Sequence, residues 1–306
     1  MADPYTTQKD LFAQDAPGDT PARAEELRAR KPLTESRRGV GGWLAEAGDA
    51  VVSVFFPAGC RICERLLTGA SRVPICGECF ASFQELPKRI CEVCGAPVLA
   101  GVFRAENGAE ERLVCRLCAD KTYAFDQARS YAVYDGALVR AILLLKFEEM
   151  EPLGAWFAER LAEVVRRESG LLATDVVVPV PLHRDREKER GYNQADLIAQ
   201  PLAKRLKLPH KAALLMRTRP RPDKQVLSLE ERWESVRGAF ATRPGSQVDK
   251  LRVLLVDDVV TTGATLDACA RTLREAGAKS VIGLTVARAI RDPLAGSVVR
   301  NPRDAR

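Results

Sequence analysis

The sequence predicts an α/β protein with a parallel sheet, preceded by a cysteine-rich double zinc ribbon. After Cys118, strand-like and helix-like patterns alternate, which is typical of parallel sheets. Before that point the cysteines fall into four Cys-x-x-Cys pairs, the spacing of zinc knuckles. The chain has 306 residues and is 46% hydrophobic, which is enough for one α/β domain and a small metal-binding module.

The first 56 residues are expected to lie outside these two parts. Residues 1–40 are rich in charged residues and proline and predict a disordered leader. Residues 41–56 predict a short amphipathic helix that contains Glu46 and Asp49. It falls short of the roughly 20 apolar residues that a membrane span needs. No apolar signal sequence precedes the cysteines, so we expect a cytoplasmic protein with no membrane span.

Residues 57–122 predict the double zinc ribbon. Each Cys-x-x-Cys pair places two thiolates on one tight turn, and two such pairs complete a tetrahedral zinc site. Two structural zinc ions are expected, in successive or cross-braced sites, because the spacing leaves both pairings open. A disulfide framework is disfavoured in a cytoplasmic chain. The predicted ligands are Cys60, Cys63, Cys76, Cys79, Cys91, Cys94, Cys115 and Cys118.

Residues 123–291 predict the α/β domain, with a core separate from that of the ribbon, and residues 292–306 predict a disordered tail. Cys269 is expected in the domain core. Pro201 predicts a kink, or a division into two shorter helices, at residues 193–207. The other helices are expected at 137–147 and 153–167, and strands at 130–134, 175–181, 253–256 and 280–287.

The most specific motif runs from Leu251 to Thr265. Val253–Val256 are continuously apolar, as in a strand buried on both faces. Asp257 and Asp258 follow at its carboxyl end, where open α/β sheets bind ligands. A turn then opens a helix whose first N–H groups can bind a phosphate. This turn consists of Thr261, Thr262, Gly263, Ala264 and Thr265. A plain helix cap by a threonine is the alternative, but it would not require two preceding aspartates. The motif therefore predicts a ribose-5-phosphate site.

This motif resembles the phosphoribosyl pyrophosphate (PRPP) signature of the type I phosphoribosyltransferases. The resemblance implies that Asp257 and Asp258 hold the ribose 2′- and 3′-hydroxyls, and that the turn from Thr261 to Thr265 holds the 5′-phosphate. It also implies a type I phosphoribosyltransferase-like parallel sheet, and PRPP bound together with Mg²⁺.

The order of several motifs resembles the ComF family, including its GntX-like members. The cysteine pairs are followed by Leu145–Phe147, Val178–Arg184, Arg186–Gln194 and then the PRPP motif. Asp223 and Ser235 depart from the family's pattern in the expected flexible loop. The resemblance implies phosphoribosyl transfer to an unidentified acceptor and a link to competence and DNA uptake.

Basic residues surround the expected position of the pyrophosphate. The segment from Pro181 to Arg237 carries 14 Lys and Arg against 8 Asp and Glu. A solvated helix with alternating charges is the alternative interpretation. The candidates for contacting pyrophosphate are Lys146, His183, Arg184, Arg190 and Lys224, of which Lys146 could equally cap a helix end.

Three classes of function follow from these motifs. The protein is an enzyme that transfers phosphoribose, or a PRPP- or nucleotide-sensing protein without turnover. Alternatively, it is an accessory factor that binds single-stranded DNA, a helicase or another DNA-uptake protein. Phe80, Phe83 and Phe103 could stack on bases, but packing in a small module is the expected use.

Overall fold

A computed structural model describes residues 59–67, 69, 71–98, 102–104, 112–120, 123–171, 173–220 and 228–290. All of them belong to one compact unit, Val52–Arg306. The predicted leader at 1–40, the helix at 41–56, the tail at 292–306 and Lys224 lie outside the described residues.

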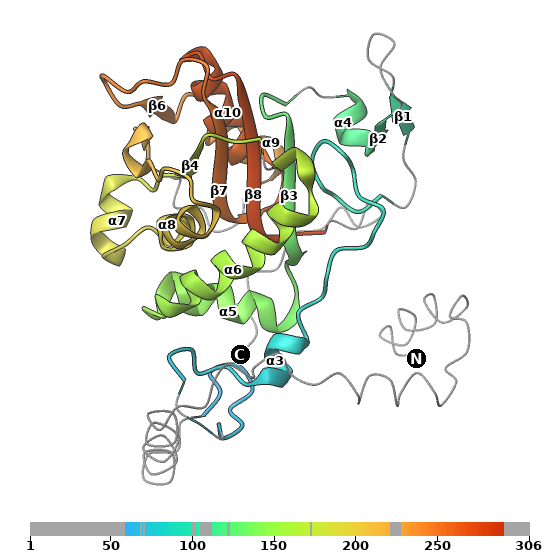
Figure 1. The fold of residues 1–306 in the computed structure, drawn as a ribbon, viewed down its shortest axis with the longest axis vertical. Coiled ribbons are helices and arrows are strands. Elements are labelled where there is room, and N and C mark those ends of the chain that lie inside the picture. The colour runs from blue at the N-terminus through green and yellow to red at the C-terminus, as the bar shows by residue number, and fades with distance from the viewer. Residues whose placement is uncertain are drawn as a thin grey trace. The chain divides into compact units, whose positions relative to one another are not determined.

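A parallel sheet of four strands forms the centre of the molecule (Figure 1). Its order is β3 (Gln127–Val133), β8 (Ser280–Arg288), β7 (Arg252–Val260) and β4 (Val176–Pro179). All neighbouring strands pair in parallel, which confirms the predicted fold class. Because helices cover both faces, the residues of β7 and β8 are almost continuously buried.

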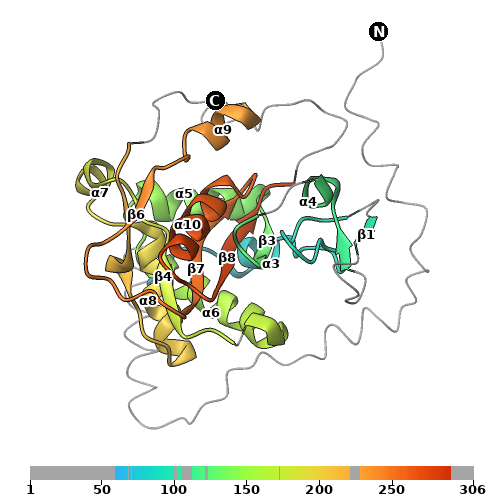
Figure 2. The ribbon, with the colours of Figure 1, turned by 90° about the horizontal axis from the view of Figure 1, so that it is seen from above.

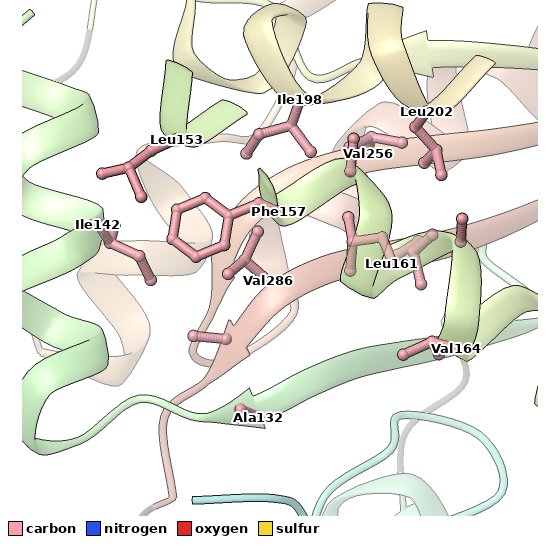
Figure 3. Packing of buried hydrophobic residues seen from close by; sticks show 14 of the residues in the cluster. Ala132, Ile142, Leu153, Phe157, Leu161, Val164, Ile198, Leu202, Val256 and Val286 are labelled. Atoms are coloured by element: carbon pink, nitrogen blue, oxygen red, sulfur yellow. The ribbon is translucent and has the colours of Figure 1, made fainter. Parts of the chain in front are cut away.

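The two faces of the sheet belong to two hydrophobic clusters. Leu254 and Val256 of β7 pack with the cluster of α5 (Gly136–Phe147), α6 (Pro152–Arg167) and α8 (Gln194–Leu206). Val253 and Leu255 pack with α10 (Ala264–Glu275) on the opposite face, since successive side chains of a strand alternate. Figure 2 shows the sheet between α10 on one side and α6 and α8 on the other, and Figure 3 shows Phe157 of α6 within the first cluster. Cys269 lies fully buried in α10, as predicted.

Pro201 lies inside one helix, α8, so of the two predicted alternatives, a kink or a division, the division into two shorter helices is wrong. Proline has no N–H, and the carbonyl of Leu197, one turn earlier, therefore lacks its usual helical donor. Gly154 of α6 packs against this carbonyl, where an added Cβ would lie 2.5 Å from the Leu197 oxygen. The missing side chain at Gly154 thus allows the two helices to meet at the proline turn.

The remaining elements are short. They are α3 (Gly77–Ala81), β1 (Val102–Arg104), β2 (Arg112–Val114), α4 (Arg116–Asp120), η2 (Ser169–Leu171), α7 (Arg184–Arg190), η3 (Ala212–Leu214), β5 (Leu215–Arg217), α9 (Leu229–Glu234) and β6 (Phe240–Thr242). β1 pairs with β2, and β5 with β6, both antiparallel.

The zinc-ribbon segment shares its core with the α/β domain, so the prediction of a separate core is wrong. Cys60 and Cys79 belong to the cluster of α5, α6 and α8, whereas Cys91 and Cys118 belong to the cluster of α10. The physical reason is size, because a segment this short cannot bury a sufficient core by itself. The stacked rings of Phe80 and Trp156, 4.3 Å apart, show the same sharing.

The ribbon segment also lies along the outer edge of β3. The N–H of Ala128 donates to the Val93 carbonyl at 2.7 Å, and that of Val133 donates to the Gln84 carbonyl at 2.8 Å. Glu85 forms an antiparallel bridge with Ala132. The edge strand of the sheet is therefore paired on both sides.

Candidate functional site

The acidic pair lies where β7 extends past its shorter neighbour. β4 pairs with β7 as far as Val256 and ends at Pro179, whereas β7 continues to Val260. Asp257 and Asp258 are thus flanked by β8 on one side, with β4 already ended on the other. Both carboxylates are buried, at 8% and 4% exposure. This is the carboxyl edge of the sheet, as the sequence predicted.

The two carboxylates carry different charges. The pKa of Asp257 is raised well above its usual range by burial and by the neighbouring charge of Asp258. Burial is the largest influence on Asp258 and acts to raise its pKa, but the Lys146 ammonium, together with hydrogen bonds from Asp257 and the Val259 N–H, lowers that pKa below its usual value. Lys146, in the last turn of α5, forms an ion pair with the Asp258 carboxylate. One negative charge on the pair is therefore matched by one lysine.

The predicted phosphate turn connects β7 to α10. Gly263 has a φ of 80°, a left-handed conformation that favours glycine, and it immediately precedes the helix. The N-cap residue is Gly263, which has no side chain to cap the helix, so neither threonine is the capping residue. The Thr262 hydroxyl accepts a hydrogen bond from the Ala264 N–H at 3.2 Å. The N–H groups of Thr265 and Leu266 follow in the first turn, where a helix supplies no acceptor of its own. The turn can therefore donate to an anion.

Three residues that the sequence interpretation missed support this turn. An added Cβ at Gly263 would lie 3.3 Å from the Tyr123 ring and 3.6 Å from the Phe125 ring. The Tyr123 hydroxyl donates to the Thr262 carbonyl at 3.4 Å, and Asp267 accepts from the Ala124 N–H at 2.6 Å. Asp267 lies at a buried position of α10, and a carboxylate on an apolar helix face was the one available signal.

Two of the five pyrophosphate candidates meet beside the acidic pair. The Arg190 guanidinium lies over the Phe147 ring, 5.0 Å from its centre, and Phe147 is the residue that follows Lys146. The Asp258 charge acts on Arg190, although burial dominates and lowers the pKa of this guanidinium. The Tyr192 hydroxyl donates to the Leu145 carbonyl at 2.7 Å. The end of α5 and the end of α7 therefore lie against each other, with Arg190 over the residue that follows Lys146.

Arg184 and His183 lie elsewhere. The Arg184 side chain is 83% exposed, and its ion pair is with Asp185 at 3.7 Å. The His183 ring also faces Asp185, at 3.3 Å, and caps α7. Within the described residues, neither side chain contacts Asp257 or Asp258.

The eight knuckle cysteines form two successive clusters. Cys60, Cys63, Cys76 and Cys79 make the first zinc site, and Cys91, Cys94, Cys115 and Cys118 make the second. Within each cluster all sulfur atoms lie within 4.8 Å of one another. The successive pairing is thus the one present, and the cross-braced alternative is excluded.

The sulfur geometry fits zinc. The Cys60–Cys79 and Cys94–Cys115 sulfur distances are both 3.8 Å. Four sulfurs placed tetrahedrally about 2.3 Å from zinc lie about 3.8 Å apart. Contact with Cys118 is the main cause that lowers the pKa of Cys115 to about 6, as suits a metal-binding thiolate. Four thiolates complete the coordination, so each zinc is structural.

Comparisons with known proteins match both parts of the chain. A family model described as a double zinc ribbon domain matches residues 51–120, and one described as a phosphoribosyl transferase domain matches residues 194–296. The chain is 32% identical over 228 residues to DNA utilization protein YhgH of Salmonella typhimurium, covering 74% of this chain and 94% of that protein.

Two further relatives carry names linked to competence. Competence protein F of Haemophilus influenzae is 28% identical over 221 residues, which cover 70% of this chain and 96% of that protein. Competence protein ComFC of Bacillus subtilis is 28% identical over 225 residues, covering 70% and 84%. Among the described residues, no helix has the length and apolar character needed to cross a bilayer.

Proposed function

The chain belongs to the ComF family of phosphoribosyltransferase-like proteins, and from this premise we propose that it binds PRPP with Mg²⁺ at the carboxyl end of β7. The observation that carries the proposal is the buried acidic pair, which two residues separate from a glycine turn that opens α10 with free N–H groups. Asp257 and Asp258 would hold the ribose hydroxyls, and the turn from Thr261 to Thr265 would hold the 5′-phosphate.

Lys146 and Arg190 would act on the pyrophosphate. Lys146 forms an ion pair with Asp258, and Arg190 is close enough to be affected by the Asp258 charge, so both cations would stabilise the negative charge that develops on departing pyrophosphate. Mg²⁺, when bound with PRPP, would supply further charge compensation between the ribose and pyrophosphate oxygens. The acidic pair would orient the ribose, which does not require it to act as a general base.

Binding should require the acidic pair. Calorimetry with PRPP and Mg²⁺ is expected to show at least about a tenfold loss of affinity in Asp257→Asn/Asp258→Asn, which is about 1.4 kcal/mol. Asp249→Asn is the matched control, because Asp249 is exposed and its ion pair is with Lys250, before β7 begins. Equal affinity of wild type and the double variant would contradict the assignment.

We further propose that the protein transfers phosphoribose, with a PRPP sensor as the alternative. Release of pyrophosphate from PRPP in the presence of pooled metabolites would support the enzyme, and PRPP binding without release would support the sensor. We place the protein in the cytoplasm, because its described cysteines form two zinc sites and a buried thiol and no disulfides, as a reducing compartment allows.

The names of the relatives favour a second function, in the handling of DNA. We propose that single-stranded DNA binds directly, with a helicase or DNA-uptake protein as the alternative partner. Phe80 and Phe83 are not suited to stacking on bases, because both pack on Trp156. A DNA site would therefore depend on basic residues such as Arg184 and Arg190.

Binding through phosphate contacts should weaken steeply with salt. Fluorescence anisotropy with labelled single-stranded DNA is expected to show this, and PRPP should compete if Arg190 serves both ligands. Arg184→Gln tests an exposed arginine away from the acidic pair and should weaken DNA binding without changing PRPP affinity. Absence of binding at low ionic strength would contradict direct binding and leave the role to a protein partner.

A further inference from the structure

Arg288, the last residue of β8, joins the sheet to the second zinc site. Its Nη1 donates to the Cys94 carbonyl at 2.5 Å, and its Nη2 donates to the Cys94 sulfur at 3.5 Å. The residue is buried, at 6% exposure. Among the described side chains, its Nε is buried without a hydrogen-bond partner, so Cys94 is the main anchor of this cation. A donor to a metal-binding thiolate orients that ligand and shares in its charge.

The backbone of Arg288 is in register with the start of the phosphate turn. Arg288 pairs with Val260, the residue immediately before Thr261, and the Ala289 N–H donates to the Val260 carbonyl at 3.0 Å. One residue therefore contacts a zinc-binding thiolate with its side chain and the base of the phosphate turn with its backbone.

The chain that leaves the second zinc site supports the same turn from the other side. Tyr123 lies five residues after Cys118, and its hydroxyl donates to the Thr262 carbonyl. The rings of Tyr123 and Phe125 stack 4.6 Å apart against Gly263. The turn is thus contacted by Tyr123 and Phe125, which follow the second zinc site in the chain, and it begins just after Val260, the sheet partner of Arg288.

In the part of the chain that the structure describes, no hydrogen bond joins the first zinc site to the phosphate turn. Cys60 and Cys79 share the apolar cluster of α5. The polar connection to the acidic pair's surroundings is an ion pair between Arg61 and Glu148, two residues after Lys146. The Arg61 side chain is 47% exposed, and an exposed ion pair contributes little. The two sites are therefore expected to differ in their effect on the phosphate turn.

We infer that Arg288 is a positioning residue that couples the second zinc site to the phosphate turn, so that zinc at this site strengthens PRPP binding. The inference rests on the proposed binding of PRPP. Without the metal, Cys94 loses the zinc–sulfur bond that fixes its sulfur and, through the side chain, the position of its carbonyl, so the buried guanidinium loses a fixed anchor. Coupling is reciprocal, so bound PRPP must also strengthen the retention of this zinc.

The reciprocal effect can be measured one site at a time. The protein loaded with two zinc ions is treated with a chelator that takes zinc but not Mg²⁺, and zinc release is followed with a chromogenic dye. Alkylation and peptide mapping at intervals identify which cysteines have lost their metal. Saturating PRPP with Mg²⁺ is expected to slow release from the second site at least about fivefold and to leave the first unchanged.

Arg288→Gln is expected to abolish this protection and to lower PRPP affinity, whereas Arg288→Lys, which keeps the charge and one donor, should retain part of it. Arg61→Gln is the matched control and should retain the protection in full. If Arg288→Gln does not fold, Arg288→Lys and the wild type still decide the question.

The failures are distinguishable. Calorimetry that finds no PRPP binding to the wild type overturns the proposed function. PRPP binding with unchanged zinc release from the second site overturns the coupling and leaves the proposed function in place. Equal protection of both zinc sites also overturns the coupling, because general stabilisation of the folded state by a ligand would cause it.

Discussion

Asp257→Asn is expected to stabilise the ligand-free protein by about 0.5–2 kcal/mol near pH 8 while weakening PRPP binding. Burial and the Asp258 charge raise the pKa of Asp257, so the folded state retains a proton that the unfolded chain has released. Wild-type stability should therefore fall as pH rises from the unfolded value of about 3.9 to the raised folded value. Asparagine carries no charge there, and its Oδ1 can still accept from the Asp258 N–H.

Asp258→Asn should have the opposite effect, because it leaves the Lys146 ammonium without its carboxylate. The Lys146 side chain is 21% exposed, and we expect a loss of roughly 1–3 kcal/mol, discounted from a fully buried pair for partial solvation. Urea unfolding at several pH values measures both variants. Lys146→Met in the Asp258→Asn background should recover part of the loss. If the two substitutions changed the free energy of unfolding in the same direction, that result would contradict the assignment of a neutral Asp257 and a charged Asp258.

Replacing Cys91 and Cys94 together with serine is expected to destabilise the α/β domain by at least about 3 kcal/mol. The second zinc site lies in the same core cluster as α10 and β7, so losing its metal removes packing from the sheet. Cys269→Ser is the control, because Cys269 is fully buried but belongs to neither zinc cluster. It measures the cost of a buried serine alone.

Two tryptophans report on this unfolding. Trp156 stacks on Phe80, which follows Cys79 of the first zinc site. Trp233 lies 5.9 Å from Tyr123, which lies five residues after Cys118 of the second zinc site. Two variants are made, one keeping Trp156 and the other keeping Trp233 as the single tryptophan. In each, Trp43 and the other tryptophan are replaced by phenylalanine. Both probes should show one shared transition in urea. Separate transitions, with the domain as stable as in the wild type, would indicate the independent ribbon that the shared core argues against.

The sequence predicted the elements better than their contacts. Hydrophobic periodicity located β7, β8, α5 and α6 because each is governed by a local pattern of burial. The pairing of Lys146 with Asp258 joins residues more than one hundred positions apart, and no local pattern reports it. Asp257 and Asp258 were found because their chemistry is contiguous in the chain.

Arg184 and Arg190 show the same limit within one short helix. Six residues at 100° each place their side chains on different faces of α7, so only one of them can turn towards α5. Charge alone could not show that Arg190 is the arginine that faces α5. Its orientation depends on the position of Phe147 and on the turn at Gly191. No sequence pattern pointed to Arg288 either, since a single arginine at a strand end is common. Its role becomes visible only in the structure, where it contacts Cys94 of the second zinc site.

The pairing of the ribbon segment along β3 has a consequence for assembly. A parallel sheet with a bare outer strand offers a row of unpaired N–H and C=O groups, onto which a strand of another chain can add. Here Val93, Gln84 and Glu85 already occupy that row opposite Ala128, Val133 and Ala132. The ribbon therefore acts as a fixed border of the sheet, closing this edge to strand addition and to the aggregation that an open edge invites.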